Sequence, residues 1–229
     1  MMWSTAIQKS LPNDSHSPAV TDILRSSWQR IDLPGADVKL WPSWLLPHEA
    51  DVLQADLLAT VPWEMHYIKL FGREVASPRL SCWIGDAGTG YTYSRTRFEP
   101  RPWPASVMAL RRHIEADCRA SFNSVLANLY RDGRDSMGWH SDDEPELGEQ
   151  PVIASLSLGV TRSLRLRRKF PRGVQAEPGD TLSLPLSHGS LLRMAGDTQR
   201  LYRHEVPKTR TVSTERINLT FRWVGQASD

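Results

Sequence analysis

Residues 215–223 read E-R-I-N-L-T-F-R-W, and this stretch decides the fold class. Apolar and polar residues alternate along it, and a period of two residues is typical of a β-strand. The apolar side consists of Ile217, Leu219, Phe221 and Trp223, and the polar side consists of Arg216, Asn218, Thr220 and Arg222. The segment is therefore predicted to be a strand that places one face against a hydrophobic core.

The polar side of this strand has two interpretations. In an ordinary half-exposed strand it faces water. Two arginines on one face also suit an anion with two carboxylates, because the planar guanidinium matches carboxylate geometry. Residues 124–130, S-V-L-A-N-L-Y, form a second predicted strand with Asn128 and Tyr130 on one face. These two residues either end an ordinary strand or offer hydrogen bonds to the same anion.

Short alternating segments continue through the second half of the chain. They cover residues 152–159, 163–168, 180–186, 190–194 and 203–207, separated by Gly, Pro or Asp. This pattern predicts many short strands joined by turns. Two helices are expected earlier, at 47–59 and at 104–120, where one face carries Val107, Leu110, Ile114 and Cys118. The predicted class is α+β, mainly β, a sandwich or jelly-roll barrel with N-terminal helices.

The chain is expected to contain one domain and one arm. Residues 1–36 are polar, contain Pro12, Pro18 and Pro34 and show little periodicity, so we expect a flexible N-terminal arm. Residues 37–229 are expected to form a single domain, because a chain of 229 residues can bury one sizeable core.

Composition indicates an ordinary globular protein, with 40% hydrophobic and 24% charged residues. No apolar run approaches the roughly 18 residues of a membrane span, and the N-terminus lacks the apolar region of a signal peptide. Cys82 and Cys118 form neither a disulfide framework nor a C-x-x-C site. We expect an intracellular protein with reduced thiols, cytoplasmic if bacterial and nuclear if eukaryotic.

An acid-rich stretch at 139–147, W-H-S-D-D-E-P-E-L, contains a candidate metal-binding pair. In an extended chain His140 and Asp142 project to the same side and can bind one ion. Such a pair also arises by chance, so it needs a distant third ligand. His204, at a strand start, is the favoured candidate, while His188 lies in the turn S-H-G-S, where we expect a structural role.

Other metal sites are less compatible with the sequence. His113 and Glu115 lie two apart on a predicted helix, where their side chains diverge. A structural zinc site prefers four Cys or His ligands, and the chain offers no such set. Two histidines and one carboxylate instead leave three coordination positions open, which is the arrangement of non-haem Fe(II) oxygenases.

Five segments share a pattern with a known family. They are N-L-Y at 128–130, H-S-D-D-E at 140–144, L-P-L-S-H-G-S-L-L-R-M at 184–194, H-E-V-P at 204–207 and R-I-N-L-T-F-R at 216–222. In order and spacing they resemble the AlkB family of Fe(II)- and 2-oxoglutarate-dependent dioxygenases, which demethylate nucleic-acid bases. The resemblance runs from about residue 40 to residue 224 and implies a double-stranded β-helix.

The resemblance also implies the roles of individual residues. It identifies His140, Asp142 and His204 as ligands of Fe(II). It implies a 2-oxoglutarate site formed by Asn128, Tyr130, Arg216, Asn218, Thr220 and Arg222, with O2 as the other co-substrate.

Substrate contacts follow from the same resemblance. Residues 63–97 look like the substrate lid of the DNA-repair branch, and Tyr91, Tyr93 and Asp143 match positions that line the base pocket. Phe71 matches the hydrophobic finger with which one human member fills a gap in duplex DNA. Ile84 departs from that branch, which has an aromatic residue there.

Phosphate contacts are expected from arginines. The candidates are Arg79 and Arg95 near the lid and Arg165 and Arg167 on one face of the strand at 163–168.

The implied activity is oxidative demethylation of 1-methyladenine and 3-methylcytosine in DNA, as repair of alkylation damage. It consumes 2-oxoglutarate and O2 and releases succinate, carbon dioxide and formaldehyde. The base must flip out of the stack to be reached, and the Asp143 carboxylate would favour these cationic bases. We expect a monomer that acts on single- or double-stranded DNA, without a membrane. The alternatives are an RNA demethylase and a non-catalytic nucleic-acid-binding module.

Overall fold

The computed structural model describes residues 27–70, 73–93, 96–170 and 181–225. Along the chain the elements are β1 (Gln29–Ile31), β2 (Asp37–Trp41), α2 (Pro47–Thr60), β3 (Glu64–Leu70), β4 (Arg73–Gly85), β5 (Tyr91–Tyr93), β6 (Thr96–Phe98), α3 (Ala105–Cys118), β7 (Ser124–Tyr130), β8 (Met137–His140), the 3-10 turn η2 (Pro145–Leu147), β9 (Ile153–Gly159), β10 (Arg162–Arg168), β11 (Thr181–Leu186), β12 (Ser190–Ala195), α4 (Thr198–Leu201), β13 (Tyr202–Val206) and β14 (Arg216–Arg222). Within these ranges no helix has the length and apolar character needed to cross a membrane.

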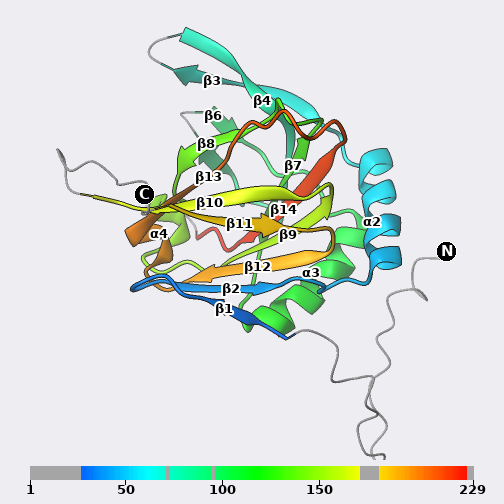
Figure 1. Ribbon diagram of the computed structural model, residues 1–229. Helices are drawn as coiled ribbons and strands as arrows, with labels where there is room; N and C mark the ends of the chain where they lie inside the picture. Colours follow the sequence, from blue (N-terminus) through cyan, green and yellow to red (C-terminus); the bar gives the residue numbers. More distant parts are fainter. Residues whose placement is uncertain (1–26, 71–72, 94–95, 171–180, 226–229) are drawn as a thin grey trace, which may run out of the picture.

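Two antiparallel sheets form a sandwich (Figure 1). The larger sheet has the order β1-β2-β12-β9-β14-β7-β4-β3, and the smaller sheet has the order β11-β10-β13-β8. Strands that pair are often far apart in sequence, as in the β14–β7 and β14–β9 pairs. This is the predicted jelly roll, so the expected fold class is confirmed.

Helices α2 and α3 pack against the larger sheet and bury the faces that the sequence predicts. Leu53 and Leu57 of α2 and the four predicted residues of α3 join one core cluster with Ile217, Leu219 and Phe221 of β14. Trp223, predicted on the same side, follows the end of the strand and is exposed. Pro47 begins α2, and Glu49 accepts the backbone N–H of Leu46 at 2.9 Å, a partial N-terminal cap.

A second core fills the space between the two sheets. Val38 and Leu40 of β2 face Leu164 and Leu166 of β10 there, and Met194 of β12 joins them. Both sheets are thus covered on their inner sides, and any polar group in this space is removed from water.

Strand β14 is buried on both faces. It lies between β9 and β7 in the middle of the larger sheet, and its polar side faces the space between the sheets. The interpretation of a half-exposed strand is therefore wrong, because the smaller sheet covers the side that would otherwise meet water.

Strand β1 places the start of the domain before residue 36. Residues 29–31 pair antiparallel with β2, and the rings of Trp28 and Trp41 meet edge-on with centroids 5.7 Å apart. The predicted arm at 1–36 is thus too long, because the backbone pairing of so short a strand leaves no periodic signal. Residues 1–26 lie outside the described residues.

The predicted lid at 63–97 contains two different parts. Strands β3 and β4 form a hairpin that projects from the sandwich at the top of Figure 1. Residues 80–85 of β4 also pair with β7 in the larger sheet, and Cys82 and Ile84 are buried in the core beneath the helices. This second part belongs to the body of the fold, so the lid prediction is too wide.

Gly159 offers a test of how β9 sets the position of β14. Its φ is +86°, and a Cβ there would lie 2.5 Å from the carbonyl oxygen of Glu215 and 3.3 Å from the Cα of Arg216. We expect Gly159→Ala to lower the free energy of unfolding by about 1–2 kcal/mol for the backbone and by about 1–3 kcal/mol more for the clash.

The matched control is Gly88→Ala, measured by the same urea unfolding. Gly88 also has a φ of +86°, but a Cβ added there would meet no atom within 4 Å, so only the backbone cost should appear. Equal losses for both variants would contradict the proposed clash with β14.

Candidate metal centre and anion pocket

Three side chains converge between the sheets. His140 ends β8, Asp142 follows in the next loop, and His204 of β13 is the strand-pairing partner of His140. Their candidate ligand atoms all lie within 4.8 Å of one another. The rings of His140 and His204 have centroids 4.1 Å apart. The structure thus brings the H-x-D pair to His204, and one metal ion could contact all three.

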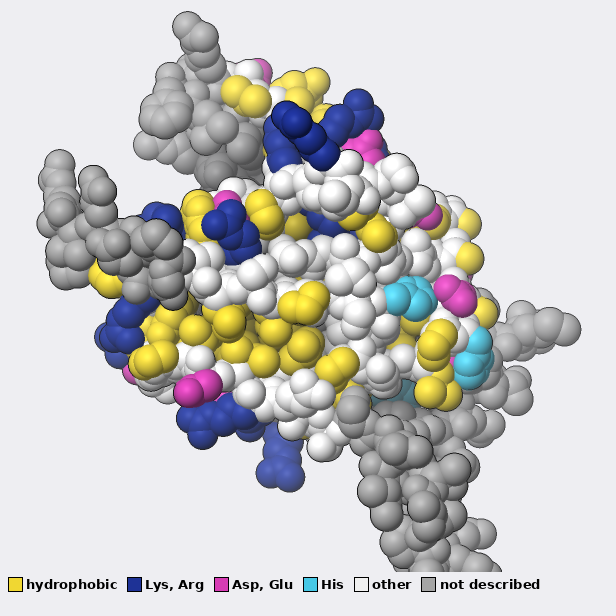
Figure 2. Space-filling view, viewed as in Figure 1, with side chains coloured by type: hydrophobic (Ala, Val, Ile, Leu, Met, Phe, Trp, Pro, Cys, Tyr) yellow, Lys and Arg dark blue, Asp and Glu magenta, His cyan; other side chains and the backbone are white. Residues whose placement is uncertain are grey.

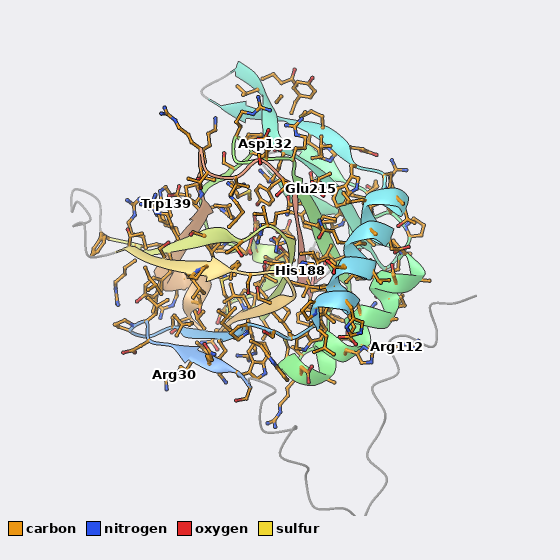
Figure 3. All side chains as sticks on the ribbon, turned by 45° about the vertical axis from the view of Figure 1, so that its right-hand side comes forward. Arg30, Arg112, Asp132, Trp139, His188 and Glu215 are labelled. Carbon is orange, nitrogen blue, oxygen red and sulfur yellow. The ribbon has the colours of Figure 1, made fainter. Side chains whose placement is uncertain are left out.

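His188, the other candidate, has a structural position. Its Nδ1 accepts the backbone N–H of Gly159 at 2.8 Å, and its Nε2 lies 3.2 Å from Oδ1 of Asp51 on α2. Figure 3 places it beside that helix. It joins α2 to the end of β9, which agrees with the predicted structural role.

Both histidines of the cluster are neutral. Nδ1 of His140 lies 2.9 Å from the carbonyl oxygen of Gly138, so it donates its proton there and leaves the Nε2 lone pair for a metal. Burial lowers the pKa of His140, against the charge of Asp142. Burial and the neighbouring His140 lower the pKa of His204 to about 3. Neutral imidazole is the form that binds metals.

The Asp142 carboxylate is ionised and held in one orientation. Burial raises its pKa, but the Arg222 guanidinium and the two neighbouring imidazoles outweigh this effect and lower it to about 2. Nη2 of Arg222 donates to Oδ1 of Asp142 at 2.8 Å. Oε1 of Gln199 accepts the backbone N–H of Asp142 at 2.9 Å and fixes the loop. The cluster therefore combines two neutral nitrogen ligands and one carboxylate.

Arg216 is a buried guanidinium without a carboxylate partner among the described residues. Only 1% of the residue is exposed. Its Nη2 donates to Oγ of Ser157 at 2.8 Å, while its Nε and Nη1 have no hydrogen-bond partner in the described part of the chain. Burial lowers its pKa to about 10, so it remains charged at neutral pH. An uncompensated buried charge costs several kcal/mol, and a carboxylate would remove this cost.

Polar side chains connect the two arginines along β14 and β7. Asn218 lies opposite Asn128 and Arg216 lies opposite Tyr130 in the strand pairing. Asn218 donates to Oγ of Ser155 at 2.7 Å and accepts from Oγ1 of Thr220 at 2.9 Å. One pocket is lined by all three candidate metal ligands and by all six residues predicted to bind 2-oxoglutarate, namely Asn128, Tyr130, Arg216, Asn218, Thr220 and Arg222.

Arg79 does not lie where a phosphate contact requires. Only 7% of the residue is exposed, its Nε donates to Oδ1 of Asn128 at 2.7 Å, and its Nη1 donates to Oγ of Ser77 at 3.2 Å. The predicted contact with phosphates is wrong, because β4 pairs with β7 and carries Arg79 inward. Arg79 instead supports the pocket wall through Asn128.

Asp143 points away from the metal cluster. Its Oδ2 lies 2.8 Å from Nζ of Lys169, which also donates to the carbonyl oxygen of Gln199 at 2.8 Å. Asp143 and Lys169 line a separate depression with Glu149 and Arg200. Contact between Asp143 and a cationic base stays a prediction, and such a base would have to compete with Lys169.

The remaining predicted substrate contacts are only partly described. The backbone of Tyr91 and Tyr93 forms β5, which pairs with β6, but their side chains lie outside the described part of the structure. Phe71 and Arg95 lie outside the described residues altogether. The predictions for these four residues stay predictions.

Two buried polar residues were missed in the sequence. Gln199 follows no recognisable pattern. Arg162 is 3% exposed and donates to the carbonyl oxygens of Asp135 at 2.9 Å and Pro207 at 2.7 Å, which ties the β7–β8 loop to the end of β13. The burial of Arg162 could have been predicted, because it lies two and four positions before Leu164 and Leu166 and so falls on the same, inward-facing side of the strand.

Comparisons with known proteins agree with this geometry. A family model described as "2OG-Fe(II) oxygenase superfamily" matches residues 37–222. The chain is 43% identical over 193 residues to "Alpha-ketoglutarate-dependent dioxygenase alkB homolog 3" of Mus musculus, which covers 82% of this chain and 66% of that protein. It is 36% identical over 200 residues to "DNA oxidative demethylase ALKBH2" of Homo sapiens, which covers 86% of this chain and 76% of that protein.

Among solved structures, "The structure of OsALKBH1" superposes with a TM-score of 0.58 at 18% identity, over 86% of this chain and 99% of that one. This likeness shows a shared fold. The chain spans just under two thirds of the length of the mouse relative. The family match and the two relatives show that the chain belongs to the AlkB family within the 2OG-Fe(II) oxygenase superfamily.

Proposed function

We propose that the chain is an Fe(II)- and 2-oxoglutarate-dependent dioxygenase that demethylates 1-methyladenine and 3-methylcytosine in DNA. The observation that carries the proposal is a single pocket that combines two neutral histidines and a carboxylate with the buried charge of Arg216. The names of the relatives support both parts, since one is called an alpha-ketoglutarate-dependent dioxygenase and the other a DNA oxidative demethylase.

In this proposal His140, Asp142 and His204 hold the iron on one side and leave its other positions open. Arg222 keeps Asp142 ionised and oriented through the hydrogen bond at 2.8 Å. Gln199 fixes the backbone of the same residue. These contacts surround the ligands and set their geometry before a metal arrives. When bound, Fe(II) with 2-oxoglutarate and O2 supplies the oxidising chemistry.

Arg216 binds one carboxylate of 2-oxoglutarate. Its Nε and Nη1 carry donors without partners among the described residues, and two parallel donors suit a bidentate carboxylate. Arg216 and Arg222 are the first and last residues of β14, and Arg222 is hydrogen-bonded to Asp142, so a co-substrate held by Arg216 would extend towards the metal cluster. Asn128, Asn218 and Thr220 form the wall between them.

The apolar part of the pocket keeps water from the reaction. Leu192 and Met194 line it from β12, in the same sheet as β14, and Leu186 lines it from β11 in the smaller sheet; all three are buried. Exclusion of water strengthens the electrostatic contacts and prevents side reactions. The N-methyl carbon leaves as formaldehyde and 2-oxoglutarate leaves as succinate and carbon dioxide, with one atom of O2 entering succinate and the other entering formaldehyde.

The proposed reaction is tested by turnover. We expect formaldehyde and succinate to form with 1-methyladenine and 3-methylcytosine in DNA, and only when both Fe(II) and 2-oxoglutarate are present. Parallel assays on single-stranded DNA, duplex DNA and RNA separate the DNA proposal from the RNA alternative. An iron-loaded, folded sample that makes no succinate with any methylated nucleic acid would refute the proposal and favour a non-catalytic binding module.

Asp142→Ala tests the metal ligands. It removes one ligand and leaves Arg222 without its hydrogen-bonded carboxylate, so we expect Mn(II) binding, measured by calorimetry, to weaken by more than about 100-fold. Glu149→Ala is the control, because Glu149 is an exposed acid of the same loop and should bind Mn(II) like the parent protein. Unchanged binding by Asp142→Ala would refute the assignment.

Arg216→Met tests the anion site, and we expect it to weaken co-substrate binding without lowering the stability of the protein. Loss of a charge-assisted contact of about 1.5–3 kcal/mol predicts a KM for 2-oxoglutarate raised by about 10- to 150-fold. The thermal midpoint without ligands should stay level or rise, because an uncompensated buried charge is removed. Arg30→Met, at an exposed arginine of β1, should change neither quantity. A normal KM in Arg216→Met would exclude Arg216 from the site.

A further inference from the structure

The outer face of the smaller sheet carries a cluster that the pocket does not use. Strands β8, β13 and β10 point His140, His204 and Leu166 inward. Their neighbours in sequence point outward, and these form the rim cluster of Trp139, Arg165, Arg167, Arg203 and Glu205. The cluster thus lies on the reverse side of β8 and β13, which carry both candidate histidine ligands, and of the neighbouring strand β10.

Within the rim cluster, the ring of Trp139 contacts the guanidiniums of two arginines. The Cζ atoms of Arg167 and Arg165 lie 4.4 Å and 5.7 Å from the ring centroid of Trp139. Contacts of a guanidinium with tryptophan hold the side chain while its N–H edges stay available. Nη1 of Arg165 also lies 2.9 Å from Oε1 of Glu205, so the charge of Arg165 is balanced locally.

The other two arginines are not balanced. Arg167 lies directly opposite Arg203 in the pairing of β10 and β13. In the ranges that the structure describes, neither has a carboxylate partner. Like charges directly opposite on neighbouring strands are unfavourable, so this arrangement weakens the sheet when nothing is bound. An anion bound between the two guanidiniums would turn this repulsion into a net attraction and stabilise the sheet.

The position of the rim cluster indicates which anion. Strand β8 is the edge of the smaller sheet, and His140 at its end has a more exposed side chain than Asp142, 17% against 4%. The metal cluster is therefore less covered at His140, on the β8 side. A polymer whose base approached the cluster from this side would pass round the edge and reach the outer face. Lys and Arg side chains lie along the upper, left-hand and lower parts of the face seen in Figure 2, around a hydrophobic area.

We propose that Arg167 and Arg203, with Arg167 held in place by Trp139, bind backbone phosphates of the nucleic-acid strand beside the base that enters the pocket. This proposal rests on the proposed function and names a surface for it. The guanidinium fork matches a phosphate as it does a carboxylate. The surface contacts backbone only, so it strengthens binding without regard to base sequence.

The test measures binding of a short, labelled, single-stranded DNA without methylated bases, by fluorescence anisotropy from about 50 to 200 mM salt. Each phosphate contact to a single strand contributes about 0.7 to the slope of log affinity against log salt concentration. The double variant Arg167→Gln, Arg203→Gln should therefore lower the magnitude of that slope by about 1.4. Trp139→Ala should lower it by a smaller amount, and Trp139→Phe should restore most of the loss.

The matched control is Arg112→Gln. Arg112 is an exposed arginine of α3 and lies at the opposite side of the molecule from Trp139 in Figure 3. It should leave the slope unchanged. An unchanged slope in the double variant, or an equal loss in the Arg112 control, overturns the proposal.

The readout needs neither metal nor turnover, so it is separable from the proposed reaction. Normal demethylation together with an unchanged slope in the double variant would overturn only the phosphate surface. A parent protein that binds no DNA and makes no formaldehyde would overturn both proposals. Urea unfolding of each arginine variant should match the parent protein or exceed it, because the repulsion between Arg167 and Arg203 is removed.

Discussion

The structure is constrained by a positively charged side chain held in the middle of the larger sheet. Arg216 is buried among strands β14, β7 and β9, and the charge is contacted by the Ser157 hydroxyl and the Tyr130 ring. Arg222, at the other end of the same strand, is neutralised by Asp142. A guanidinium without a counterion inside a protein is costly. The stability contributed by the apolar side of β14, which packs beneath the helices, has to exceed that cost.

The metal cluster is a consequence of closing the sandwich around this strand. All three candidate ligands come from the smaller sheet and its β8–η2 loop, while the positive charge that keeps Asp142 ionised comes from the larger sheet. Neither sheet contains the site alone. The packing of the two sheets therefore sets the geometry of the cluster. Gln199 and Arg162 do not line the pocket, but their buried hydrogen bonds hold the loops on either side of β8.

Much of the fold could be predicted from residue spacing, and much of the candidate site from spacing together with the family resemblance. Alternation located β14 and β7, and helical spacing located the buried face of α3. The H-x-D spacing, with a distant histidine, named the metal cluster. The features that residue spacing did not predict have a common origin. The inward turn of Arg79, the Lys169 partner of Asp143 and the pairing of β1 with β2 all depend on which segment lies alongside.

The sequence by itself determined the periodicities, hence the strand and helix faces, and with the family resemblance it named the residues of the candidate site. Tertiary structure alone decided which arginines are buried and which are exposed. Arg162, Arg165 and Arg167 occupy one strand and look alike in sequence, yet Arg162 is buried among backbone carbonyls while the other two stack on Trp139 at the surface. The physical reason is that the environment of a charge is set by the strand opposite, and strand pairing here joins residues that are far apart along the chain.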